Sequence, residues 1–313
     1  MKQDSGMQAE NKDQLRFVGH ARINFRLYDQ CVANAGTSLV YAWSWYLDIM
    51  AGEWDALVWG NYSYVMPVPT RRKWGIRYVY TPVFAQQLGI YPTPPVEIQK
   101  AFIDRLTHRF RYINYQTGND LNENILAGFT VKPLHTRVLS LEPGYEDISS
   151  QYAGYIRRNL KKAGSNGIEI FRQTDPSSFF RLQKESKDIP VPEKSWKCLR
   201  KLMEATLPNG RGLIYAASGP SGEINAAAFF VVWNNRAYYL MVVSDHEGRE
   251  KRAVFALLDR FIRDFEGQPV IFDFEGSAVP GVDSFFESFG AVKEPYRMLS
   301  LNRLPGLMKL IKR

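Results

Sequence analysis

The sequence has 313 residues, of which 45% are hydrophobic, 14% aromatic and 23% charged, with a formal net charge of +8 at pH 7. Apolar material on this scale supports a dense core, and the length favours two domains of about 150 residues each. Only two cysteines are present, Cys31 and Cys198, and neither belongs to a zinc-binding motif, which argues against a disulfide framework; reduced thiols and no metal site are expected.

The N-terminal segment, MKQDSGMQAENKDQ, is polar and lacks the apolar core of a signal peptide. No run of about 18 uncharged apolar residues follows that would span a bilayer. The nearest candidate, residues 224–244, is split by Asn234, Asn235 and Arg236, which predict a hairpin turn. We therefore expect a cytoplasmic protein without a transmembrane segment.

The positive charge gathers in four short clusters, at residues 71–77, 157–162, 249–252 and 309–313. Charge runs of this kind are usually solvated faces, and that alternative stays open for each cluster. Taken together, the clusters also fit a phosphate-bearing substrate, whereas no DNA partner is expected.

The first half of the chain predicts an α/β unit. Residues 41–50 predict a short aromatic helix, DALVWGN and YSYVMPVP predict two strands joined by a tight turn, and RYVYTP predicts a third strand. Residues 98–110 are apolar at helical spacing, and RYINYQ alternates as a strand.

A loop in this half carries two adjacent glutamines, Gln86 and Gln87, close to Pro82 and Gly89. Because a loop that follows a strand favours ligand contact over core packing, we expect the two amides to bind substrate. The alternative is that they satisfy the N–H and C=O groups of the loop itself.

The second half repeats the order of elements. Residues 152–163 predict a helix closed by Gly164, IEIFRQ predicts a strand, and residues 178–186 and 195–207 predict helices. The strands GLIYAAS, INAAAFFVVW and AYYLMVVS, an amphipathic helix ending at Phe265 and the strand VIFDF follow. Pro143 and Gly144 punctuate the join, so the expected lobes are residues 1–148 and 149–313.

The spacing of strand centres supports a duplication. Leu57 and Ile113 lie 56 residues apart, and Ile214 and Phe272 lie 58 apart. Although residue identity between the halves is negligible, this near-equality indicates a repeated α/β unit.

The last of these strands ends in two carboxylates, Asp273 and Glu275. They are two residues apart, so in a strand both point to the same face. Glycines and a proline then break the chain before a short helix with Phe285, Phe286 and Phe289 on its apolar face. We expect an acid/base or amine-binding site; the alternative is that the carboxylates line a solvated sheet rim or cap the next helix.

This order of elements resembles the tandem GNAT fold of the Fem-type peptidyltransferases and their shorter acyltransferase relatives, over residues 41–301. YIRRNLKKAG (155–164) is similar to the basic helix that opens the family's second lobe, and residues 226–243 to its central hairpin. DFEGS and GVDSFFESFGA resemble its ending, before a tail that here contains Pro295 and Tyr296. The resemblance implies an α/β (mixed α+β) protein of two GNAT-like lobes, each a mixed, mostly antiparallel sheet flanked by helices.

Two features depart from the family. The long paired-helix arm of members that use aminoacyl-transfer RNA is missing, so the chain resembles a short, armless form. GNAT enzymes hold the coenzyme A pyrophosphate with an R-x-x-G-x-G/A loop at a helix N-terminus. The corresponding segment, DHEGREKRA (245–253), has one glycine and no second one at the required offset, so Arg249, Lys251 and Arg252 would hold the phosphates by side chain.

The resemblance implies an N-acyltransferase that transfers an acyl group from acyl-coenzyme A to a primary amine by direct attack, with acyl-coenzyme A as co-substrate and no tightly bound cofactor. Glu275 would accept the amine proton, and Asp273 would orient it or bind the ammonium form. Tyr296 would donate to the leaving group; the alternative is a buried tyrosine whose hydroxyl is satisfied by the backbone. The residues expected to contact the donor are Val243, Gly248, Arg249, Arg252 and Ala253, and those expected to contact the acceptor are Gln86, Gln87, Arg157 and Asn159.

Two alternatives stay open. One is an aminoacyl-tRNA-dependent peptidyltransferase that acts on a cell-wall precursor, and the other is a non-catalytic binding protein that retains the fold. The expected partners are accordingly a small-molecule amine or a peptidoglycan-precursor-like acceptor and, for the first alternative, aminoacyl-tRNA. The sequence has no G-x-S-x-G elbow and no H-E-x-x-H motif, as direct transfer requires neither.

Overall fold

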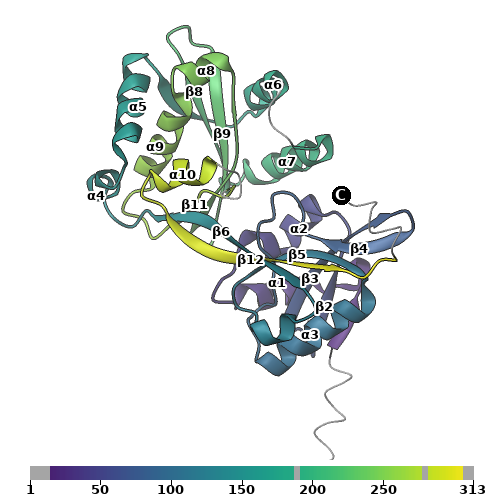
Figure 1. Cartoon of the computed structure of the whole chain (residues 1–313). Coiled ribbons are helices and arrows are strands. Elements are labelled where there is room, and N and C mark those ends of the chain that lie inside the picture. The colour runs from purple at the N-terminus through teal and green to yellow at the C-terminus, as the bar shows by residue number, and fades with distance from the viewer. Residues whose placement is uncertain (1–14, 187–190, 277–280, 306–313) are drawn as a thin grey trace, which may run out of the picture. The chain divides into compact units, whose positions relative to one another are not determined.

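The computed structural model describes residues 15–186, 191–276 and 281–305. The chain forms two units: unit 1 consists of the residues up to Leu134 and from Pro295 onward, and unit 2 is His135–Glu294. The chain leaves unit 1 within strand β6 (Thr130–Ser140) and returns within β12 (Val292–Asn302) (Figure 1). This division differs from the expected boundary at residue 148, because the C-terminal strand pairs with β5 of unit 1.

Unit 1 is a mixed sheet with helices. Its strands lie in the order β1 (Leu15–Val18), β2 (Trp54–Trp59), β3 (Tyr64–Lys73), β4 (Ile76–Tyr80), β5 (Tyr112–Gly118) and the C-terminal part of β12. Among the described strand pairs of this unit, β4 and β5 alone run parallel. The helices are η1 (His20–Arg22), α1 (Phe25–Ala33), η2 (Val40–Ala42), α2 (Ser44–Met50), α3 (Val96–Arg109) and η3 (Glu123–Leu126). Aromatic side chains form much of its core: Tyr28, Tyr41, Tyr46, Trp54, Phe102 and Tyr115 are fully buried.

Among the described residues, unit 2 contains six further strands of one 12-stranded sheet. Its strands lie in the order β6, β11 (Ile271–Asp273), β10 (Arg236–Ser244), β9 (Ile224–Trp233), β8 (Gly212–Ser218) and β7 (Glu169–Gln173), and only β10 and β11 run parallel. The helices are α4 (Tyr145–Ser150), α5 (Gly154–Ser165), α6 (Ser177–Glu185), α7 (Glu193–Thr206), α8 (His246–Glu250), α9 (Ala253–Phe265) and α10 (Val282–Glu287). Each unit is therefore a mostly antiparallel sheet with one parallel pair, which confirms the expected fold class.

The core of unit 2 is built by α9 on the sheet. Phe261 of α9 stacks on Phe230 of β9 with ring centroids 4.1 Å apart, and Phe272 of β11 lies 4.9 Å from Phe261. Helices α5 and α9 lie on one side of the sheet, and α6 and α7 on the other (Figure 1). Stacked and tilted aromatic pairs of this kind add about 0.5–1.5 kcal/mol each beyond the area they bury.

Local turns follow the sequence with one exception. Asn234 and Asn235, with φ of 46° and 57°, form the predicted turn between β9 and β10. The predicted end of helix α5 at Gly164 is wrong by one residue, because the helix continues to Ser165. The left-handed conformation that ends a helix is supplied by Gly167, with a φ of 67°.

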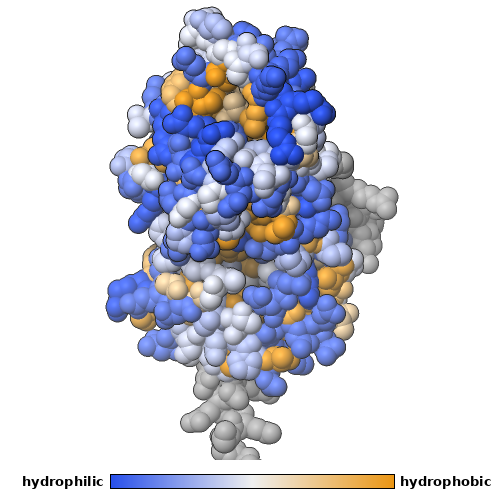
Figure 2. All heavy atoms as spheres, turned by 90° about the vertical axis from the view of Figure 1, so that its left-hand side faces the viewer, coloured by the Kyte–Doolittle hydropathy of each residue, from blue (hydrophilic) through white to orange (hydrophobic). Residues whose placement is uncertain are grey.

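The surface that carries α4 and α5 is mostly hydrophilic, with small separate hydrophobic patches (Figure 2). Across the three described ranges, none of the helices is both long and apolar enough to cross a membrane. Cys31 is buried in unit 1 and Cys198 is half-buried in α7 of unit 2; both are free thiols.

Asp283, at the start of α10, is tied to the sheet by two side chains. Arg137 donates from Nε and Nη2 to its two oxygens at 2.7 and 3.0 Å, and His135 Nε2 lies 2.9 Å from Oδ1. The hydrogen bonds from Arg137 hold the pKa of Asp283 well below its ordinary value. Asp283 therefore stabilises the fold above its unfolded pKa of about 3.9, and this contribution is lost as the pH falls below that value.

We expect Asp283→Asn to make the free energy of unfolding less dependent on pH under acidic conditions. The free energy of unfolding should fall at neutral pH and depend less on pH between about pH 4 and 2, because the variant has no carboxylate to protonate. Urea unfolding at a series of pH values measures both effects. Asp104→Asn, which alters an exposed pair with Lys100, is the control. If the pH dependence of the free energy of unfolding below pH 4 is the same in Asp283→Asn as in the unchanged protein, Asp283 is not the carboxylate whose protonation destabilises the fold.

Candidate functional site in unit 2

The candidate site lies where two parallel strands part. β10 and β11 pair from Arg236 to Tyr238 and from Ile271 to Asp273. β11 ends there, whereas β10 continues to Ser244, about 20 Å further at 3.3 Å a residue. Over this length, the described part of the chain places no strand beside that edge of β10. An edge of this kind accepts an extended ligand by backbone hydrogen bonds, as an added strand would.

Glu275 lies at one end of this edge, directly after β11. Its side chain is partly buried, and its φ of 51° is left-handed. That conformation costs a residue other than glycine about 1–2 kcal/mol, and such strain is concentrated at functional sites. The N–H of Glu275 donates to Asp273 Oδ1 at 3.0 Å, which fixes the turn.

Asp273 is fully buried and fully paired. Arg236 donates to Asp273 Oδ2 from Nε at 3.0 Å and from Nη2 at 2.6 Å, and Thr136 Oγ1 donates to Oδ1 at 2.6 Å. Arg236 also binds Glu294. Burial lowers the pKa of Arg236, but the two carboxylates outweigh it and raise the pKa above its ordinary value. Of the two roles expected for Asp273, this geometry favours orienting Glu275 over binding an ammonium group.

The other end of the open edge is the segment of α8 and the start of α9. Gly248 packs so closely on β9 that a Cβ would lie 2.4 Å from Asn225 O and 2.6 Å from Ser244 Oγ. Only glycine fits this position. The N–H of Gly248 donates to Asp245 Oδ1 at 2.7 Å, which caps α8.

Arg252 completes this segment in a conformation that glycine usually adopts. Its φ is 66°, it precedes α9, and no side chain caps that helix. Its Nε is buried and has no hydrogen-bond partner among the described residues. Arg249 donates to Ser244 O at 2.8 Å, and Lys251 pairs with Glu247. A buried N–H without a partner beside an uncapped helix N-terminus is a feature of anion-binding positions. The donor contact expected of Arg252 stays a prediction.

The other expected donor contacts have buried side chains. Val243, on β10, is 1% exposed and Ala253, at the start of α9, is fully buried, so only their backbones are available to a ligand. Tyr296 is 5% exposed and lies on β12 opposite Gly118, in unit 1, whereas Glu275 belongs to unit 2. The roles of all three residues stay predictions.

The expected acceptor residues bind their own neighbours. Arg157 Nη1 donates to the carbonyls of Ser149 and Ser150 at 3.3 Å, and Asn159 Nδ2 donates to Tyr155 O at 2.8 Å. Gln86 and Gln87 are 8% and 4% exposed, and Gln87 Nε2 donates to Gln86 Oε1 at 3.2 Å. The two amides therefore bind each other, and their expected contact with the acceptor stays a prediction.

Two residues of the site were not predicted. Arg236 had been assigned to a turn, yet it neutralises Asp273. Asn225 is 1% exposed, and its Nδ2 donates to Asp245 Oδ2 at 3.1 Å and Glu247 Oε2 at 3.3 Å, which ties α8 to β9. The sequence feature that could have identified Arg236 is its position at the start of an apolar strand, because a charged side chain there needs a buried partner of opposite charge.

Comparisons with known proteins agree with this geometry. Residues 150–280 match the acetyltransferase (GNAT) domain family. Among solved structures, the chain is similar to FemX (TM-score 0.63, 12% identity, 93% of this chain and 99% of that chain). It is also similar to L-PGS from Bacillus licheniformis (TM-score 0.55, 10% identity, 92% of this chain and 95% of that chain). A third similar structure is a tandem GNAT protein from the clavulanic acid biosynthesis pathway (TM-score 0.50, 11% identity, 94% of this chain and 100% of that chain). A search of curated proteins finds no match.

Proposed function

We propose that this chain, whose fold is that of tandem GNAT proteins and whose residues 150–280 match an acetyltransferase (GNAT) domain, transfers an acyl group from acyl-coenzyme A to a primary amine. The acceptor is a small-molecule amine or an amine-bearing molecule that resembles a peptidoglycan precursor. The donor enters unit 2 as a co-substrate, and no tightly bound cofactor is required.

The observation that carries this proposal is the buried, unpaired Nε of Arg252 at the uncapped start of α9. It supports an anion site at one end of the open edge of β10, and Glu275 follows β11 at the other end. Acyl-coenzyme A has matching chemistry, because its diphosphate and its thioester are joined by a long arm that contains amides. We propose that the arm lies along β10 and brings the thioester toward Glu275.

The proposed reaction needs no covalent enzyme intermediate. The amine nitrogen attacks the thioester carbonyl and the N–C bond forms, while Glu275 accepts the amine proton directly or through a water molecule. The C–S bond then breaks and coenzyme A leaves as a thiol after it receives a proton. Asp273 holds the backbone of Glu275 in place. A positioned general base of this kind contributes about 10² to 10⁴ in rate.

We expect the double variant Arg249→Ala/Arg252→Ala to bind coenzyme A at least about 10-fold more weakly than the unchanged protein. Each charge-assisted hydrogen bond that is lost contributes about 1.5–3 kcal/mol. Calorimetric titration measures the affinity. Arg260→Ala, at an exposed pair with Asp264 further along α9, is the matched control and should bind normally.

Two outcomes would redirect the proposal. Equal affinity in the double variant would remove Arg249 and Arg252 from the donor site. If the unchanged protein does not bind coenzyme A at any accessible concentration, the donor is not coenzyme A, and aminoacyl-tRNA or a non-catalytic binding function becomes the better hypothesis.

A further inference from the structure

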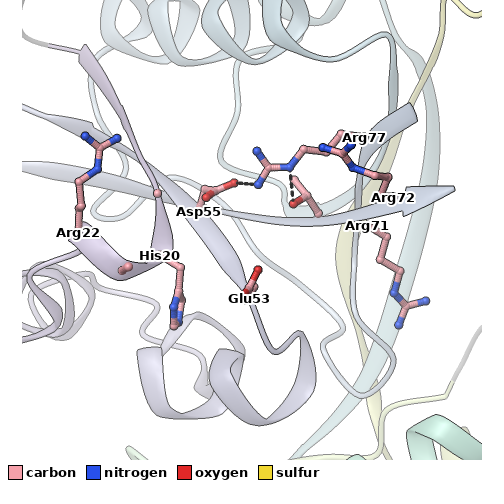
Figure 3. A pocket seen from close by; sticks show the side chains of 10 residues that line it. His20, Arg22, Glu53, Asp55, Arg71, Arg72 and Arg77 are labelled. Atoms are coloured by element: carbon pink, nitrogen blue, oxygen red, sulfur yellow. Dashed lines mark hydrogen bonds and ion pairs between the residues drawn. The ribbon is translucent and has the colours of Figure 1, made fainter. Parts of the chain in front are cut away.

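Unit 1 contains a second charged cavity, separate from the site proposed in unit 2. Its volume is about 500 Å³, and it lies between η1 and the hairpin of β3 and β4. The charged side chains around it are His20, Arg22, Glu53, Asp55, Arg71, Arg72 and Arg77 (Figure 3). Ligand pockets usually have volumes of about 300–1,000 Å³, so this one is large enough for an organic molecule.

The register of the hairpin brings two like charges together. Arg72 of β3 lies directly opposite Arg77 of β4, so both side chains are on one face of the sheet. Thr70 lies diagonally from Arg77 on the same face, and its Oγ1 accepts a hydrogen bond from Arg77 Nε at 3.0 Å. Like charges in a directly opposed pair are destabilising unless a counter-charge is present.

One carboxylate compensates only one of these arginines. Arg77 Nη2 pairs with Asp55, which is 6% exposed and lies on β2 (Figure 3). Within the described ranges, neither Arg72 nor Arg22 has a carboxylate partner. Asp55 therefore holds Arg77 in place, while the cavity keeps an excess of positive charge.

We propose that this cavity binds a phosphate-bearing ligand through Arg72, Arg77 and Arg22. A phosphate group carries more charge than a carboxylate and offers several acceptor oxygens in the geometry that arginine pairs bind. The cavity exceeds the size of a single phosphate, so the ligand is a phosphate ester of an organic group. A soluble ester and a lipid headgroup share this chemistry.

Lys73 provides a matched control, because it follows Arg72 on β3, pairs with Ile76 of β4 and does not line the cavity. Its Nζ lies over the ring of Trp74, 4.8 Å from the centroid. Replacing Lys73 with Gln removes the same charge from the same strand without removing a contact inside the cavity.

The test is calorimetric titration with inorganic pyrophosphate in a protein that carries Arg249→Ala and Arg252→Ala, so that the site in unit 2 does not contribute. We expect saturable binding that weakens as sodium chloride is added. Arg72→Gln should weaken it by about 10- to 100-fold, and Lys73→Gln by less than about 3-fold. Arg22→Gln, on a different element, should also weaken binding, and melting temperatures verify that each variant folds.

A second arm identifies the source of the phosphate. Co-sedimentation is measured with phosphatidylcholine vesicles that contain or lack phosphatidylglycerol. Binding to the phosphatidylglycerol vesicles that Arg72→Gln abolishes would identify a lipid headgroup, and Arg72-dependent binding of pyrophosphate alone would identify a soluble ester. The proposal is overturned if neither probe binds, or if Lys73→Gln and Arg72→Gln weaken binding equally.

Discussion

Replacing Arg236 with Met is expected to lower the free energy of unfolding by about 3–5 kcal/mol, because it leaves the Asp273 carboxylate buried without its counter-charge. Asp273 has no exposed surface, and Arg236 is its cationic partner. Met fills a similar volume, so the loss of charge rather than a cavity dominates the effect. Urea unfolding of the variant and the unchanged protein measures it.

A double-mutant cycle separates the ion pair from other losses. Adding Asp273→Asn to Arg236→Met should recover part of the stability, because a neutral amide is less costly to bury than an unpaired carboxylate. Fully additive effects would mean that the two residues do not interact in the folded protein. The cycle also tests whether the fold of unit 2 depends on Asp273, a residue that the sequence predicts to act in chemistry.

Glu275→Gln is expected to reduce the single-turnover rate by about 10² or more and to change coenzyme A affinity little. The amide keeps the size and shape of the side chain but cannot accept the amine proton. The rate is measured with acetyl-coenzyme A and an amine that a panel of acceptors has identified. The left-handed backbone is unchanged in this variant, so the melting temperature should stay close to that of the unchanged protein.

The control for this variant is Glu169→Gln, which removes an exposed carboxylate from β7 in the same unit. Its rate should be unaltered. A folded Glu275→Gln protein that retains the full rate would exclude the base, and the alternative that Glu275 only caps the following helix predicts at most about 2 kcal/mol of lost stability with normal turnover.

Elements with strong periodicity or long apolar runs were predictable from the sequence, and several others were not. Helix α9 and strands β8 to β10 have strong periodicity or long apolar runs, and they form where expected. Strand β6 begins with exposed residues and contains Pro133, so the alternation of apolar and polar residues along it is weak. The sequence therefore did not predict this strand. The pairing of β12 with β5 was also missed, because no local pattern encodes a contact between segments so distant in sequence.

The candidate site was predictable in its position but not in its partners. Asp273 is the last residue of β11 and Glu275 lies two residues beyond it, so the sequence placed the pair correctly at the end of a strand. It did not reveal that one is neutralised by Arg236, because that contact depends on the register of β10 against β11. Likewise, the charge cluster at residues 71–77 was visible, but only the hairpin register separates Arg71 from Arg72.

The return of the chain through β12 has a consequence for biosynthesis. Because β12 follows all of unit 2 in the sequence, a ribosome releases β5 long before the strand that pairs with it. Unit 2 is continuous and can fold first, whereas unit 1 must wait with one edge of β5 unpaired, a state that invites association with other chains. Unit 1 therefore completes its sheet only after β12 has been synthesised. Until then, a chaperone that shields unpaired strand edges would act on the N-terminal part of the chain.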